Sequence, residues 1–340
     1  MYQETASKLA QRACPSIAYR IRKEILREDI SSPGMMALQE EILREPEIVR
    51  LFALQKEDGW LGGLFHGTDE PESAIRYLAE KGVEPSHPAI QRALHAIILR
   101  GDAFDKGCME RVGKPLDEKH LGGSKLIKAC VFAYACDEKH DFVREAVSEA
   151  LHVFRYVCSV TRMEDVCEPY KEKLVFRPYV LWPSIYHLRL LAHTHLWRTE
   201  ANKQMLAMAV KRLAELSPIP EIKVLHKHQV ISPASVYMNS FNDDMTALGG
   251  REWMMWFHRT ELIARLGIAP KLDYAVRQLN VVHKLLAQSS GFFTQKLRHY
   301  YFTKWTQYIG LALETDWRTE EKRINDLTFR CLLIQSYQEG

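Results

Sequence analysis

Two stretches of the chain end in the same four residues: LLAHTHLWRTE at 190–200 and GLALETDWRTE at 310–320. The Trp-Arg-Thr-Glu at 197–200 recurs 120 residues later, at 317–320. In both places an apolar run precedes the shared residues and a run with helical spacing of apolar positions follows them. Recurrence at a long interval is typical of proteins built from repeated helical units.

Short turns between and before these two stretches extend the repeat. They are EKGVEP at 80–85, CDEKH at 136–140 and LGIAP at 266–270. The 235 positions from Gly82 to Trp317 (317 − 82) make four steps, so the period is about 59 residues. We therefore expect six helical hairpins, of which the first is the least clear, at roughly 17–44, 71–100, 124–156, 182–214, 252–287 and 305–337.

The two helices of each expected hairpin differ in character. Residues 127–135 and 305–313 are apolar on nearly all sides, as a helix buried on all sides must be. Residues 203–216 instead have one apolar stripe and one charged face, which suits an outer helix. Six inner and six outer helices predict an all-α (α/α)6 toroid, a single domain over residues 1–340 with its long loops at one end. The alternative is an open solenoid of the HEAT or armadillo type, whose repeats are shorter, about 40–47 residues.

Composition narrows the classes of partner and the compartment. The 46 basic and 43 acidic residues leave a formal charge of +3, without the basic excess that nucleic-acid binding requires. No apolar run reaches the roughly 18 residues of a membrane span, and the charged start has no secretory signal. Seven scattered cysteines without a C-x-x-C indicate neither a disulfide framework nor a zinc ribbon. We expect a cytoplasmic protein, and the oligomeric state stays open.

One stretch resembles a known superfamily. LQKEDGW at 54–60, followed by Gly62 and Gly63, resembles the QW-type repeat of the terpenoid cyclase and protein prenyltransferase α/α-toroid superfamily. The resemblance implies a toroid, and it implies that the motif braces neighbouring helix ends rather than taking part in catalysis. The residues that carry this structural motif are Gln55, Asp58, Gly59 and Trp60.

The catalytic signatures of that superfamily are incomplete in this chain. The Asp-x-Asp-Asp of class II cyclases is reduced to Asn242-Asp243-Asp244, and an Asp-rich magnesium motif is absent from the sequence. A zinc set of the prenyltransferase kind is matched only by Asp165, Cys167 and His228. Because Cys167 runs into Glu168-Pro169 instead of the usual glycine and aromatic residues, the sequence weighs against zinc, and we expect no cofactor.

The toroid hypothesis places the long connections at the N-termini of the inner helices. Those ends carry free N–H groups and a positive partial charge, so they favour an anionic group, unless local Asp and Glu caps neutralise them. Aromatic and polar residues crowd the same end and are expected either to line a cavity or to pack in the core. The expected substrate-binding residues are Trp182, His193, Tyr237, Asn239, Trp253, Trp256, Arg259, Arg298, His299, Tyr300 and Trp305.

Four residues are candidates for catalysis. Tyr186 and Arg189 share a face of the helix after Trp182, and His187 lies between them. An Arg and a His in an apolar helix need partners, which are either a ligand or loop carboxylates. Asp243 is the candidate general acid or base, since burial and its acidic neighbour would raise its pKa, with helix capping as the alternative.

These patterns lead to three hypotheses about function. The first is a protein that binds or transforms an isoprenoid-like apolar small molecule with an anionic head in an aromatic-lined cavity, and the resemblance implies cyclase- or prenyltransferase-like chemistry if it is an enzyme. The second is a carbohydrate-active lyase or hydrolase that uses the same cavity. The third is a non-enzymatic helical scaffold.

Overall fold

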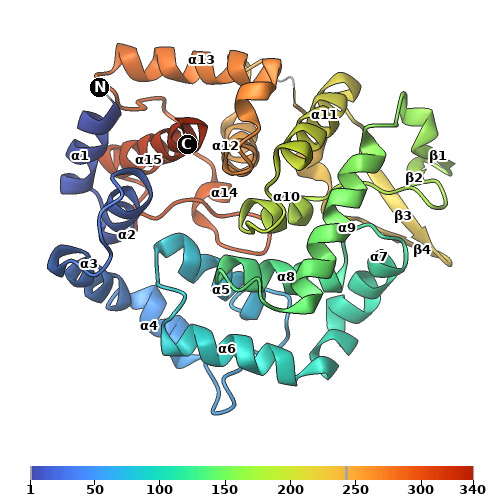
Figure 1. Cartoon of the computed structure of the whole chain (residues 1–340), viewed down its shortest axis with the longest axis horizontal. Coiled ribbons are helices and arrows are strands. Elements are labelled where there is room, and N and C mark those ends of the chain that lie inside the picture. Colours follow the sequence, from blue (N-terminus) through green and yellow to red (C-terminus); the bar gives the residue numbers. More distant parts are fainter. Residues whose placement is uncertain (1, 242–243, 340) are drawn as a thin grey trace. The chain divides into compact units, whose positions relative to one another are not determined.

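The computed structural model describes residues 2–241 and 244–339 and is mostly helical, with 59% of the chain in helix and one small sheet (Figure 1). The helical part of the expected fold class is confirmed. The chain divides into two compact units, each discontinuous in sequence. Unit 1 comprises Met1–Leu99, Met245–Ala264 and Arg277–Gly340, and unit 2 comprises Arg100–Asp244 and Arg265–Val276. No helix among the described residues combines the length and the apolar character needed to cross a membrane.

Unit 1 is built from helices and one long segment without helix or strand, residues 304–319. Its helices are α1 (Tyr2–Arg12), α2 (Pro15–Arg20), α3 (Pro33–Leu43), α4 (Pro46–Ala53), α5 (Pro71–Lys81), α6 (Pro88–Leu99), α12 (Gly250–Arg265, all but its last residue), α13 (Asp273–Gln288, from Arg277 onward), α14 (Tyr300–Thr303) and α15 (Glu320–Glu339).

Prolines and glycine set the limits of several of these helices. Each helix from α2 to α6 begins with a proline, whose fixed φ suits the first turn and whose missing N–H costs nothing there. Gly82 ends α5 in the left-handed conformation, with φ of 85°. The sequence analysis placed this helix end correctly.

The core of unit 1 joins both ends of the chain. Apolar side chains of α1 and α2 pack against Phe329, Leu332 and Leu333 of α15. Figure 1 shows α1 and α15 side by side. Leu313, from the segment before α15, is buried in the same cluster. A segment without regular secondary structure is therefore anchored in the core.

Unit 2 combines helical hairpins with the sheet. Its helices are α7 (Lys114–Glu118), α8 (Ser124–Tyr134), α9 (Asp141–Val157), α10 (Ile185–Ala192) and α11 (Glu200–Leu216). The α8–α9 and α10–α11 pairs agree with the expected hairpins at 124–156 and 182–214. The thiol of Cys130 on α8 lies 3.2 Å from the carbonyl oxygen of Tyr186 on α10, so these two helices are in close contact.

A four-stranded sheet lies in the connections that the sequence analysis treated as loops. Its strands are β1 (Cys167–Tyr170), β2 (Lys173–Phe176), β3 (Ile222–His226) and β4 (Gln229–Ile231), in the order β1-β2-β3-β4. The β1–β2 and β3–β4 pairs are antiparallel hairpins, and β2 runs parallel to β3 with Leu174 opposite Ile222. The all-α expectation is wrong here. The strands are short and their two-residue turns are Lys-Glu and Lys-His, without the Asn-Gly or Asp-Gly that signals a hairpin.

The sixth expected hairpin departs most from expectation. The five hairpins from 17–44 to 252–287 each contain two helices, but the region from 304 to 319 contains none before α15 begins at Glu320. The prediction of a helix over 305–313 is wrong. The closed ring of six hairpins stays a prediction.

Candidate functional site

The segment 304–319, which has bends and turns but no helix or strand, is held by buried cations from α5 and α15. Arg76 donates to the carbonyl groups of residues 306, 309 and 310 at 2.6–3.3 Å. Lys81 Nζ donates to the Leu313 carbonyl at 2.6 Å, and Arg330 to the Leu311 carbonyl at 2.5 Å. These bonds take the place of bonds that a helix would make within itself, and this explains why an apolar, helix-like sequence is irregular here.

A carboxylate binds the N–H groups of the same segment. Asp326 on α15 accepts hydrogen bonds from the backbone of Leu313 at 2.7 Å and of Glu314 at 3.1 Å, and from the Trp317 indole at 2.5 Å. Burial raises the pKa of Asp326 to about 6, although the three donors oppose this shift. Charged side chains thus bind both carbonyl and N–H groups of the segment's backbone.

Two of these buried cations, Lys81 and Arg330, also have carboxylate partners. Lys81 Nζ lies 2.6 Å from Glu45, and Arg330 lies 3.0 Å from Glu80 and 2.8 Å from Glu261. Arg330 and Lys81 are 2% exposed or less. Removing one partner from such a buried cluster would leave an uncompensated charge. The segment is therefore tied to helices that come from widely separated parts of the chain.

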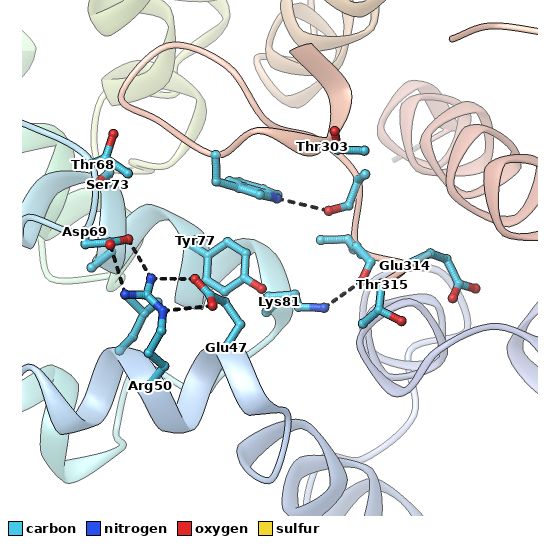
Figure 2. Close-up of a pocket in the computed structure, with 15 residues that line it drawn as sticks. Glu47, Arg50, Thr68, Asp69, Ser73, Tyr77, Lys81, Thr303, Glu314 and Thr315 are labelled. Atoms are coloured by element: carbon cyan, nitrogen blue, oxygen red, sulfur yellow. Dashed lines mark hydrogen bonds and ion pairs between the residues drawn. The ribbon is translucent and has the colours of Figure 1, made fainter. Parts of the chain in front are cut away.

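The segment forms one wall of a cavity of about 410 Å³ within unit 1 (Figure 2). The facing walls come from α4, from the loop before α5 and from α5 itself. The lining combines charged, hydroxyl and aromatic side chains: Glu47, Arg50, Asp69, Lys81 and Glu314; Thr68, Ser73, Thr303 and Thr315; Tyr77 and Trp305.

Each charged side chain that lines the cavity is paired with a side chain of opposite charge. Figure 2 shows the Arg50 guanidinium between two carboxylates, with the nearest oxygens of Glu47 at 2.6 Å and of Asp69 at 2.7 Å. The hydrogen bonds to Glu47 and then to Asp69 raise the pKa of Arg50 above its ordinary value. Lys81 pairs with Glu45, and Glu314 lies 3.0 Å from Lys322. The lining therefore offers hydrogen bonds without a free cation for an anionic ligand.

Tyr77 and Trp305 supply the aromatic surface. Their ring centroids are 4.9 Å apart in an edge-to-face arrangement. Trp305 Nε1 donates to the Ala312 carbonyl at 3.1 Å, which fixes the indole. Burial, and then the negative charges of Glu45 and Glu47, raise the pKa of Tyr77. Its phenol is therefore protonated at neutral pH and is a hydrogen-bond donor.

A second group lies on the same two segments. The imidazole of His66 bonds to the buried carboxylate of Glu72 through Nδ1, and the Tyr308 hydroxyl lies 3.3 Å from His66 Nε2. This chain orients the Tyr308 hydroxyl and links the loop before α5 to the segment that carries Trp305.

The residues that the sequence analysis grouped at one mouth belong partly to unit 1 and partly to unit 2. Trp305 lines the cavity of Figure 2, and Arg298, His299 and Tyr300 line an open groove of unit 1. Trp253 and Trp256 belong to an aromatic cluster of unit 1 with Phe257 and Phe293, where neighbouring ring centroids are 5.1–5.7 Å apart. Arg259 is buried on α12. The remaining ones lie in unit 2: Trp182, Tyr186, His187, Arg189, His193, Tyr237 and Asn239.

His187 and its neighbours on α10 are buried. The backbone N–H of Ser184 donates to His187 Nδ1 at 2.9 Å, so the imidazole completes a capping box at the start of α10. Burial lowers the pKa of His187 to about 3, and the ring is neutral at pH 7. The Arg189 guanidinium lies 5.3 Å from the centre of the Tyr186 ring. Asp243, together with Asn242, lies outside the described residues.

The zinc set and the QW-type motif have distinct surroundings. Asp165 bonds to Thr161 at 2.9 Å and to Arg162 at 3.1 Å, and the Cys167 thiol lies 3.3 Å from the Met163 carbonyl oxygen. His228 is in the turn between β3 and β4. Over residues 2–241 and 244–339, no group of three or more His, Cys, Asp or Glu side chains is arranged to hold a metal ion.

The QW-type motif forms a turn fastened to α6. Gln55 Nε2 donates to the carbonyl groups of Gly59 at 2.9 Å and of Ala89 at 2.8 Å. Asp58 accepts from the Trp60 backbone at 3.1 Å, and the buried Trp60 indole donates to Gly63 at 3.1 Å. Gly59 has φ of 89°, and a Cβ there would lie 2.5 Å from the Arg92 carbonyl oxygen, so the turn requires glycine.

Most of the cavity residues were missed by the sequence analysis. Arg50, Tyr77 and Lys81 were not candidates, although Arg76, Tyr77 and Lys81 are polar residues on a helix that was expected to be buried. That is the signal that drew attention to Tyr186, His187 and Arg189, and applied to residues 71–81 it would have found the cavity. Comparison with family models, curated proteins and solved structures gives no match for this chain.

Proposed function

We propose that the cavity of Figure 2 in unit 1 binds an uncharged, polyhydroxylated group, such as one or two sugar units of a ligand. The observation that carries the proposal is the lining itself, in which paired charges, hydroxyl groups and a fixed indole meet in one pocket. This is the carbohydrate alternative of the sequence analysis, restricted here to binding.

The size of the cavity and the pairing of its charged side chains support this ligand class. About 410 Å³ lies within the range of small-molecule sites. Carboxylate oxygens of Glu47 and Asp69 retain lone pairs beyond those used by Arg50, and they accept hydrogen bonds from ligand hydroxyls. An anionic ligand gains little here, because Arg50 and Lys81 are already neutralised.

The aromatic pair supports it further. The Tyr77 phenol is a protonated donor at the cavity, and the indole of Trp305, held by Arg76 at 4.9 Å and by Ala312, adds apolar surface to the wall. An isoprenoid would leave the charged and hydroxyl groups of this mixed lining without partners, so the lining favours the carbohydrate reading. The toroid ring, the superfamily resemblance, a cytoplasmic location and the lack of a cofactor stay predictions, and the proposed site requires unit 1 alone.

Titration calorimetry tests the proposal with glucose, maltose, cellobiose and inositol as ligands and farnesyl diphosphate as the competing class. We expect at least one of the hydroxylated ligands to bind and Tyr77→Phe to weaken it about tenfold, the loss of roughly one hydrogen bond. Tyr179→Phe is the matched control, since Tyr179 is 98% exposed and lies in unit 2, and it should leave affinity unchanged.

Two results would overturn the proposal. One is the absence of binding by every hydroxylated ligand tested. The other is binding that Tyr77→Phe leaves intact. Binding of farnesyl diphosphate alone would favour the isoprenoid hypothesis instead.

A further inference from the structure

An open groove adjoins the cavity of Figure 2. Thr303 and Thr315 line both spaces, so the groove begins where the cavity wall ends. Its volume is about 730 Å³, and it lies entirely within unit 1. A ligand larger than the cavity would extend into this groove past the two threonines.

The charge of the groove differs from that of the cavity. Arg318 pairs with Asp316 at 3.0 Å, so these two charges offset each other. Arg298, which is exposed, makes no ion pair with any residue of 2–241 or 244–339. The groove therefore has one cation in excess, whereas every charged side chain of the cavity lining is in an ion pair.

The backbone that carries Arg298 is held in place. A Cβ added to Gly250 would lie 2.8 Å from the Arg298 carbonyl oxygen, so the two backbones are in close contact. The next residue, His299, accepts a hydrogen bond from the Tyr301 backbone at 3.2 Å and caps α14. The side chain of Arg298 thus starts from a backbone position that neighbouring contacts hold in place at the rim.

Arg298 and the aromatic groups beside it suit an anionic sugar substituent. A guanidinium binds a carboxylate, sulfate or phosphate through two parallel hydrogen bonds. Tyr300, which is 59% exposed, and Trp317, whose ring stacks on Phe302 at 4.7 Å, provide flat surfaces in the same groove. A sugar that carries a negative charge would use both features, the guanidinium for its anionic group and the aromatic surfaces for its ring.

We propose that the ligand of unit 1 is an acidic saccharide, with an uncharged ring in the cavity and its anionic group at Arg298 in the groove. This inference rests on the proposed function, because it assigns the cavity to the uncharged part. It extends that function by naming the charge of the ligand and the residue that recognises it.

Calorimetry with matched pairs tests this inference: glucose against glucuronate and glucose 6-phosphate, and cellobiose against its uronic acid. We expect the acidic member to bind about tenfold tighter at 50 mM salt, and the ratio to shrink at 0.5 M salt because the groove is exposed. Arg298→Gln should reduce the ratio below twofold. Arg44→Gln, an exposed arginine outside both spaces, should leave it unchanged.

The outcomes separate the two proposals. Binding of the uncharged sugars without any preference for the acidic ones overturns this inference and leaves the proposed function standing. Absence of binding in every arm overturns both. A preference that persists in Arg298→Gln, or inorganic phosphate that binds as tightly as the acidic sugar, overturns the assignment of Arg298. Glucuronate and glucose 6-phosphate together show which anion is preferred.

Discussion

Residues 190–200 and 310–320 share a sequence ending but not a structure upstream of it. In both, the glutamate of Trp-Arg-Thr-Glu is the first residue of a long helix, α11 at Glu200 and α15 at Glu320. Before it, one stretch continues from α10, whereas the other has no regular secondary structure through 304–319. The start of a helix therefore follows from the local sequence, and the conformation before it does not.

The hydrogen bonds of the two stretches explain the difference. Arg198 of the first donates to the carbonyls of Ala192 at 3.0 Å and Thr194 at 2.9 Å, at the end of α10, and also to that of Arg265 at 2.7 Å. In the second, Arg318 is 94% exposed, and the carbonyls of residues 310–313 bond instead to Arg76, Lys81, Trp305 and Arg330. Cations from other elements decide the course of the backbone only in the second stretch.

The largest effect on this comparison is expected from Arg330→Met. The substitution removes the donor to Leu311 and leaves Glu80 and Glu261 without this partner in a buried site. We expect the free energy of unfolding to fall by about 3–5 kcal/mol, measured by urea denaturation.

Arg198→Met is the counterpart in the helical stretch. It removes hydrogen bonds to carbonyl groups at a partly exposed site, so we expect a loss of only about 1–2 kcal/mol. Equal losses for the two variants would contradict the view that cations from other elements contribute more to stability in segment 304–319 than in residues 190–200.

Acid should act on the two stretches in opposite directions. His187, at the start of α10, has a folded pKa of about 3, below its unfolded value of about 6.5. Its contribution is full above pH 6.5 and is lost as pH falls, by about 2 kcal/mol at pH 5. Asp326, which binds the backbone of segment 304–319, has a folded pKa of about 6, above its unfolded value of 3.8. Its contribution is full below 3.8 and is lost as pH rises, by about 1 kcal/mol between pH 5 and 7.

Stability curves from pH 4 to 8 for two variants check these signs. His187→Gln, which keeps a capping-box side chain, should lose less stability in acid than the native chain does. Asp326→Asn should remove the part that falls as pH rises. Curves parallel to that of the native chain in either variant would refute the assignment for that residue.

The smallest effect concerns the two threonines of the shared motif. The Thr199 side chain accepts from the backbone of Asn202 at 3.2 Å and caps α11, whereas the Thr319 hydroxyl bonds to Asp316 at 3.3 Å. We expect Thr199→Ala to lower the unfolding free energy by about 1 kcal/mol and Thr319→Ala by less. Thermal melts of the two variants check the order, and a larger loss for Thr319→Ala would reverse it.

The parts of the fold that could be predicted are those that local chemistry specifies. Proline at the first position, Gly82 at the end of α5 and Thr199 before α11 set helix limits without help from the rest of the chain. The sheet was missed because each strand has only three to five residues and gains its burial from neighbouring strands. Periodicity alone does not detect such short strands.

The candidate site was predicted only in part, for a related reason. Trp305, Arg298, His299 and Tyr300 were found because aromatic and basic residues crowd that stretch of sequence. Arg50, Tyr77 and Lys81 were missed, since they reach the same space from helices more than 200 residues earlier in the chain. Their importance depends on what the fold places opposite them.

By itself, the sequence determined where many helices of this protein begin and end, and it specified the turn built on Gln55, Asp58, Gly59 and Trp60, because these depend on φ preferences and hydrogen bonds between near neighbours. Only the tertiary structure decided that residues 304–319 form no helix and that a cavity lies beside them. The physical reason is that a buried carbonyl group bonds to whichever donor the fold brings to it, and here those donors are Arg76, Lys81 and Arg330.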